Sequence, residues 1–134
     1  MNIKSFIPAI AWGILIFVII SMPASSIPDS SFLDIPHFDK LVHFSMFLGF
    51  TFLLCAGFYL KDKKGITSIH FLFVALIGLL YGGITELFQE FFFDSRHGSF
   101  VDFIANTIGV VAGITVFCFL RKSKLMAVFK FLEK

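Results

Sequence analysis

The sequence predicts an all-α membrane protein in which four transmembrane helices form an antiparallel bundle, with both termini in the cytoplasm. Four apolar stretches, at residues 6–22, 41–60, 69–93 and 100–120, each have the roughly 17 to 25 residues that a helix needs to cross a ~30 Å hydrocarbon core. Most of the 11 basic residues lie in the amino terminus, the second loop or the carboxyl tail, and such segments stay in the cytoplasm. These are Lys4, Lys61, Lys63, Lys64, Arg121, Lys122, Lys124, Lys130 and Lys134.

Composition leaves little room for anything beyond the four spans. The chain has 134 residues, is 57% hydrophobic and has a mean hydropathy of +0.92. We therefore expect one transmembrane domain, residues 1–120, followed by a basic amphipathic tail, residues 121–134, on the inner leaflet. Anionic lipids explain the lysine clusters, so no nucleic-acid partner is expected. Cys55 and Cys118 lie in predicted spans and show no metal or redox spacing, and no cofactor is expected.

The first span also has features of a secretory signal peptide, with Lys4 before an apolar run and small residues at 24–26. The run is long enough to span, and no clear Ala-x-Ala cleavage site follows it, so we expect a retained helix. The loop after it is rich in proline and is expected to be extended or turn-rich. The second loop, 61–68, is a short charged turn, and the third, 94–99, is so short that its two helices should be antiparallel neighbours.

Polar residues gather at the predicted outer ends of three helices. A charged residue at the centre of a span costs on the order of 2.5 to 3.5 kcal/mol on insertion scales, so these residues require an explanation. They are Asp39, Lys40 and His43 in the second span, Glu86 and Gln89 in the third, Arg96 and His97 in the third loop, and Asp102 and Asn106 in the fourth span. The alternating directions of the helices predict that all of them surround one outward-facing pocket.

The fourth span gives the sharpest geometry. Asp102, Asn106, Gly109 and Gly113 fall within ~60° of one another at about 100° per residue. The two glycines form a GxxxG step, which permits close contact with another helix, so the polar face is also the packing face.

Structural roles are the alternative interpretation of these residues. Asp39 and Lys40 could mark the membrane boundary, and Asn106 could link helices through its amide. Glu86 could form an ion pair with Lys40 or Arg96.

Three sequence blocks resemble the VanZ-like family. They are DKLVHF at 39–44, YGGITELFQ at 81–89, and Arg96 with Ser99 followed by DFIANTIG at 102–109. The resemblance covers most of the chain and implies a small multi-pass protein of the bacterial inner (cytoplasmic) membrane. The founding type of the family is associated with low-level resistance to the glycopeptide teicoplanin.

Our main hypothesis is a protein that acts on or binds a lipid-linked cell-envelope component, such as a lipid-linked phosphate or a peptidoglycan precursor, among the membrane lipids. The candidate catalytic residues are His43, Glu86 and Asp102, with His43 or Glu86 as general base or acid and Asp102 orienting the base. The candidate substrate-binding residues are Asp39, Lys40, Gln89, Arg96 and Asn106. In this group Lys40 and Arg96 would hold an anionic head group. The spacing of Asp39, His43, Glu86 and Asp102 is not diagnostic of a metal site, and none is predicted.

Two other functions stay open. A non-catalytic envelope protein would bind a lipid head group or a glycopeptide in the same pocket. A small proton-coupled carrier fits less well, because four helices are few and the polar residues stop in the outer half of the membrane. Formation of a homo-oligomer would remove that objection.

Overall fold

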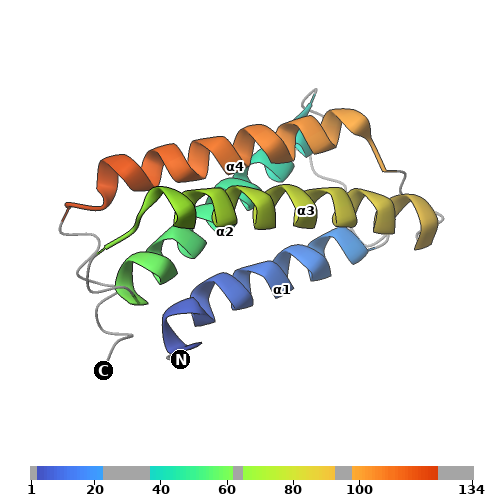
Figure 1. Cartoon of the computed structure of the whole chain (residues 1–134). Helices are drawn as coiled ribbons and strands as arrows, with labels where there is room; N and C mark the ends of the chain where they lie inside the picture. Colours follow the sequence, from blue (N-terminus) through green and yellow to red (C-terminus); the bar gives the residue numbers. More distant parts are fainter. Residues whose placement is uncertain (1–2, 23–36, 62–64, 93–97, 124–134) are drawn as a thin grey trace.

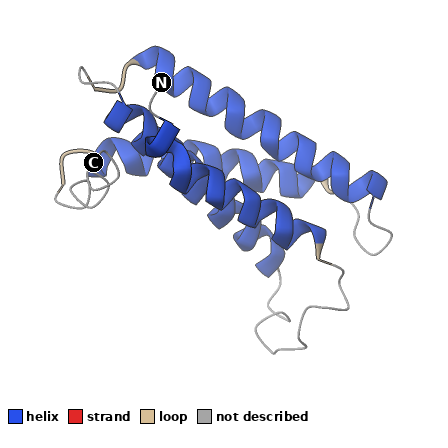
Figure 2. Cartoon of the chain, turned by 90° about the horizontal axis from the view of Figure 1, so that it is seen from below, coloured by secondary structure: helices blue, strands red, loops and turns tan. Residues whose placement is uncertain are grey.

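Four long helices make up nearly all of the chain that the computed structural model describes, which comprises residues 3–22, 37–61, 65–92 and 98–123. The 3-10 helix η1 (Ile3–Phe6) leads into α1 (Ile7–Ser21), which is followed by α2 (Phe38–Lys61), α3 (Ser68–Phe92) and α4 (Phe100–Leu120). Among these residues no strand occurs (Figure 2). Four helical segments, the first comprising η1 and α1, are long and apolar enough to cross a membrane, so the predicted all-α fold is confirmed.

Some expectations concern segments outside the described residues. These are most of the proline-rich first loop and of the carboxyl tail, together with Arg96 and His97 in the third loop.

The second helix begins earlier than its apolar stretch. It starts at Phe38, so Asp39 and Lys40 lie in its first turn. An acidic side chain is favourable there because the first N–H groups of a helix carry a partial positive charge. In α1, Pro8 lies in the first turn, where a missing N–H costs nothing.

Figure 1 shows the direction of each helix by its colour. The chain runs from left to right along α1 and α3, and from right to left along α2 and α4. The start of α1 and the end of α4 therefore lie at one end of the bundle. The ends of α1 and α3 and the starts of α2 and α4 lie at the other.

The pair α2 and α4 forms the most extensive helix contact. A Cβ atom at Gly109 would meet the Phe44 carbonyl oxygen, and one at Gly113 would meet the Leu48 carbonyl oxygen and the Thr51 hydroxyl. The GxxxG step thus lets the backbone of α4 approach that of α2 closely, as its spacing predicted.

The first helix is attached in a different way. Its buried residues Ile16 and Ile20 belong to the apolar core. Two side chains also bond to backbone carbonyls across helices: Trp12 Nε1 donates to Met46 O at 2.9 Å, and the Tyr81 hydroxyl donates to Gly13 O at 2.6 Å.

Candidate functional site

Six of the predicted site residues meet at the end of the bundle where α2 and α4 begin and α3 ends. We call them the polar cluster: Asp39, Lys40, His43, Glu86, Asp102 and Asn106. Their side-chain bonds form two groups, one centred on Lys40 and one on Asn106.

The first group joins α2 to α4 through the Lys40 ammonium. Its Nζ lies 2.7 Å from Asp39 Oδ2 and 2.8 Å from Asp102 Oδ1. The Asp39 side chain is 61% exposed, whereas that of Asp102 is only 11% exposed. Asp102 is therefore the buried partner of Lys40. Since an ammonium has three N–H donors, one donor of Lys40 is left for another acceptor.

The second group joins three helices through the Asn106 amide. Asn106 Nδ2 donates to Glu86 Oε1 at 2.9 Å, and His43 Nδ1 lies 3.1 Å from Asn106 Oδ1. His43 Nδ1 is also 3.4 Å from Glu86 Oε1. All three residues are buried, so their bonds are shielded from water and correspondingly important for packing.

This arrangement selects one tautomer of His43. Glu86 Oε1 accepts the N–H of Asn106 Nδ2, so the Asn106 Oδ1, which can only accept hydrogen bonds, faces His43. His43 Nδ1 must then donate, which leaves Nε2 of a neutral imidazole as a proton acceptor. Within the described residues, His43 Nε2 has no hydrogen-bond partner. The arrangement thus holds the His43 ring through Asn106 and leaves the Nε2 atom of a neutral ring as a hydrogen-bond acceptor.

The second oxygen of Glu86 has a structural role that the sequence analysis missed. Glu86 Oε2 accepts the backbone N–H of Ser99 at 3.1 Å, and Ser99 is the N-cap residue of α4. The Ser99 hydroxyl in turn accepts the Val101 N–H. The signal was the Ser-x-x-Asp spacing of Ser99 and Asp102, which is typical of a capping box. In a capping box, the acid three residues after the N-cap accepts the backbone N–H of the N-cap residue. Here Asp102 bonds to Lys40 instead, and Glu86 accepts the Ser99 N–H.

The glycine before this cap is needed for space. A Cβ atom at Gly98 would meet the backbone carbonyl oxygen of Glu86. The Gly98 N–H also donates to Glu90 Oε2 at 3.0 Å. The turn into α4 is thus held against the last part of α3, which fixes the position of Glu86.

Two predicted site residues, Gln89 and Arg96, do not belong to the polar cluster. Gln89 is buried, at 4% exposure, and its side chain makes no hydrogen bond to another described residue. Arg96 lies outside the described residues. Glu86 does not pair with Lys40, because Lys40 bonds to the two aspartates instead. In the described part of the chain, no three His, Cys, Asp or Glu residues are arranged to hold a metal ion.

Four membrane-length apolar helices, with polar residues joined at one end, define a multi-pass membrane protein. The family model described as VanZ/LLP1 matches residues 3–121, and the chain belongs to this family. The predicted VanZ-like membership is thereby confirmed. Neither a curated protein nor a solved structure matches the chain.

Proposed function

We propose that the chain lies in the bacterial cytoplasmic membrane as an antiparallel bundle, with both termini in the cytoplasm and the polar cluster facing outward. The helix directions in Figure 1 support this topology. Lys4, Lys61, Arg121 and Lys122 lie at or next to the ends of helices on one side of the bundle. Basic residues of this kind favour the cytoplasmic side, which places the polar cluster at the outer face.

At that face the polar cluster recognises the polar head of a lipid-linked cell-envelope component, such as a lipid-linked phosphate or a peptidoglycan precursor. The observation that carries this proposal is the joining of buried polar groups from three helices, with two groups left unpartnered among the described residues. These are the His43 Nε2 atom and the Gln89 amide. No fully buried side-chain nitrogen or oxygen atom among the described residues lacks a hydrogen-bond partner, so the His43 Nε2 atom and the Gln89 amide remain accessible to a ligand.

Each residue of the cluster then has a distinct task. Lys40 offers its third N–H donor to an anionic head group, while Asp102 holds the ammonium in place. His43 Nε2 accepts a proton or a hydrogen bond, and Glu86 orients His43 through Asn106. The Gln89 amide bonds to the ligand, and Arg96, which lies outside the described residues, is predicted to add a second cation. Recognition of a wall precursor would alter susceptibility to glycopeptides such as teicoplanin.

The test compares envelope-antibiotic susceptibility, teicoplanin included, in cells that lack the protein and in cells complemented with variants at matched membrane levels. We expect Glu86→Gln and Asp102→Asn to behave like the empty strain. Glu90→Gln is the matched control, because it makes the same change one turn further along α3, outside the cluster, and keeps an amide oxygen that can accept the Gly98 N–H. If both cluster variants protect as well as the wild type, the carboxylates are structural and the site assignment is wrong.

The same assay separates catalysis from binding. The His43→Gln side chain can still donate a hydrogen bond to Asn106 but cannot take up a proton. Complete loss of protection indicates a general base, whereas partial loss favours non-catalytic binding.

A further inference from the structure

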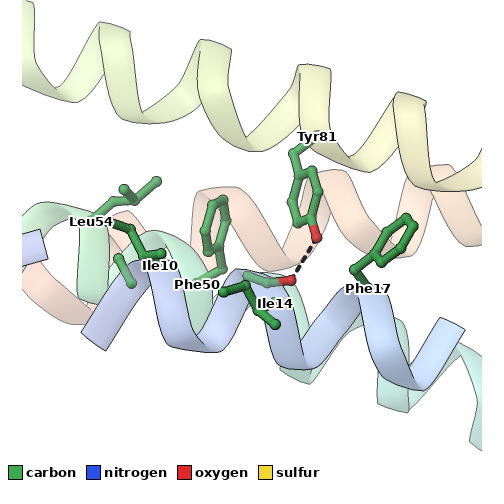
Figure 3. Close-up of a pocket in the computed structure, with 8 residues that line it drawn as sticks. Ile10, Ile14, Phe17, Phe50, Leu54 and Tyr81 are labelled. Carbon is green, nitrogen blue, oxygen red and sulfur yellow. Dashed lines mark hydrogen bonds between the residues drawn. The ribbon is translucent and has the colours of Figure 1, made fainter. Parts of the chain in front are cut away.

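An apolar groove of about 420 Å³ runs between α1 and α3, with α2 behind it (Figure 3). Its lining includes Ile10, Ile14 and Phe17 from α1, Phe50 and Leu54 from α2, and Tyr81 from α3. Among the lining side chains, Tyr81 carries a polar group, its hydroxyl. This hydroxyl already donates a hydrogen bond to Gly13 O (dashed line in Figure 3). The groove therefore offers an occupant no unsatisfied hydrogen-bonding side chain.

We propose that this groove binds one hydrocarbon chain of a lipid whose head group lies at the membrane face of the polar cluster. The inference rests on the proposed function for the identity of that face. It adds a second site, for the tail, to the site for the head group.

The depth of the groove fits a chain from one leaflet. Its α1 lining runs from Ala9 to Phe17, which is about 6 to 18 Å from the helix end at Ser21 at 1.5 Å per residue. Half of the hydrocarbon core is about 15 Å thick. Ser21 lies at the same end of the bundle as the polar cluster (Figure 1). A chain that enters from that face thus extends along most of the groove, whose deepest α1 residue, Ala9, lies about 18 Å from Ser21.

The end of the groove nearest Ser21 lies at the same depth in the bundle as the polar cluster. Phe17 packs edge-to-face against Phe88, with 5.7 Å between ring centroids, and Phe88 follows Glu86 by two residues on α3. Deeper in the bundle, the Tyr81 ring contacts Phe47, which lies one turn after His43 on α2. A lipid with its tail in the groove therefore has its head within reach of the cluster.

The volume of the groove distinguishes a hydrocarbon chain from other possible occupants. At roughly 30 Å³ per water-sized group, the groove accommodates on the order of 14 methylene groups, which is one acyl chain. A helix from a second copy, about 10 Å wide over a 12 Å length, would need on the order of 900 Å³. Water is excluded because the lining provides no polar partners, and apolar cavities of this kind stay dry.

The groove differs from the cavity on the other side of α1. That cavity, of about 500 Å³, is lined by residues of α1 and α2, Trp12 and Met46 among them. The lining of the groove includes a third helix, because Tyr81 of α3 takes part in it, and the Tyr81 hydroxyl joins α3 to α1 through its bond to Gly13 O.

Photolabelling of the purified full-length protein tests the proposal. The vesicles contain phosphatidylethanolamine and phosphatidylglycerol, with a trace of phosphatidylglycerol that carries a diazirine in the middle of one acyl chain. Labelled residues are located by mass spectrometry. We expect saturable labelling of the groove lining, several-fold stronger than that of the outward face of α1.

Matched substitutions on α1 provide the control. Ile10 and Val18 are 49% and 52% exposed, and only Ile10 lines the groove. Ile10→Trp should reduce groove labelling several-fold, and Val18→Trp should leave it unchanged. Ile14→Trp is a second filling variant, for use if Ile10→Trp does not fold.

Two results would overturn the proposal. One is uniform labelling over all the lipid-facing residues, and the other is wild-type labelling in a folded filling variant. The labelling uses an ordinary phospholipid and reads the groove directly, without relying on the activity of the polar cluster. A failure of the susceptibility experiment therefore leaves the labelling result intact, and the two proposals can fail separately.

Discussion

Removal of either partner of the Lys40–Asp102 pair should destabilise the bundle, but by unequal amounts. Lys40→Met leaves the Asp102 carboxylate, whose side chain is 11% exposed, without a cation among the described residues. Loss of one partner of a buried pair costs about 3 to 5 kcal/mol, and the 26% exposure of Lys40 places this change at the low end, about 3 kcal/mol. Asp102→Asn keeps an acceptor oxygen for Lys40, which also retains Asp39 at 2.7 Å, so it should cost about 1 kcal/mol.

The double variant distinguishes this explanation from a general packing effect. With both charges removed, no buried carboxylate lacks a cation at this position, and the total cost should fall to about 1 to 2 kcal/mol. The coupling energy of the cycle is then about 2 to 3 kcal/mol, within the range for residues in contact. Unfolding of the purified protein in detergent micelles, followed by circular dichroism, measures all four forms. Additive costs, or an Asp102→Asn variant as unstable as Lys40→Met, would refute the reasoning.

Two further predictions concern the packing of the helices. Gly113→Ala should destabilise the fold by about 1 to 3 kcal/mol, because the added Cβ meets the Leu48 carbonyl oxygen and the Thr51 hydroxyl. Gly83→Ala is the control, because the atom nearest to its added Cβ is Phe103 Cε2 at 3.7 Å, an ordinary contact distance. This change should leave the stability unchanged or raise it by up to about 1 kcal/mol. The same unfolding assay measures both, and equal effects would contradict the close approach of α2 and α4. Tyr81→Phe removes the 2.6 Å bond to Gly13 O and should cost about 1 kcal/mol, and an unchanged unfolding midpoint would show that α1 does not depend on this bond.

The helices could be predicted from the sequence because the length of an apolar run depends on the bilayer and not on tertiary contacts. The start of α2 could not be read from apolarity in the same way. Asp39 and Lys40 precede the apolar run, yet they belong to the helix because its first turn accommodates polar side chains. The bonds of Trp12 and Tyr81 to backbone carbonyls leave no pattern in the sequence, since any exposed turn of a neighbouring helix could supply the acceptor.

For the candidate site, the sequence predicted which faces meet but not which atoms bond. Helical spacing placed Asp102 and Asn106 on the face of Gly109, and this face does pack on α2. The choice of Asp102 as the partner of Lys40, and of the Ser99 N–H as the partner of Glu86, depends on the axial positions of the helices. Those positions follow from backbone contacts at single glycines and from the turn at Gly98, which spacing alone does not determine.

The α2–α4 contact and the α1–α3 contact are built differently, and they match the head group and the hydrocarbon chain of the proposed ligand. The polar cluster spans the contact between α2 and α4, where glycines bring the backbones together, so its donors and acceptors are held in fixed positions. Such preorganisation suits the recognition of a polar head group, because fewer side chains must be ordered on binding. The groove lies where the Tyr81–Gly13 hydrogen bond and the Phe17–Phe88 ring contact join α1 to α3, and an apolar chain requires volume and no directed contacts. A rigid polar end beside an adaptable apolar groove is therefore the arrangement expected for a protein that binds a whole lipid-linked molecule and not its head group alone.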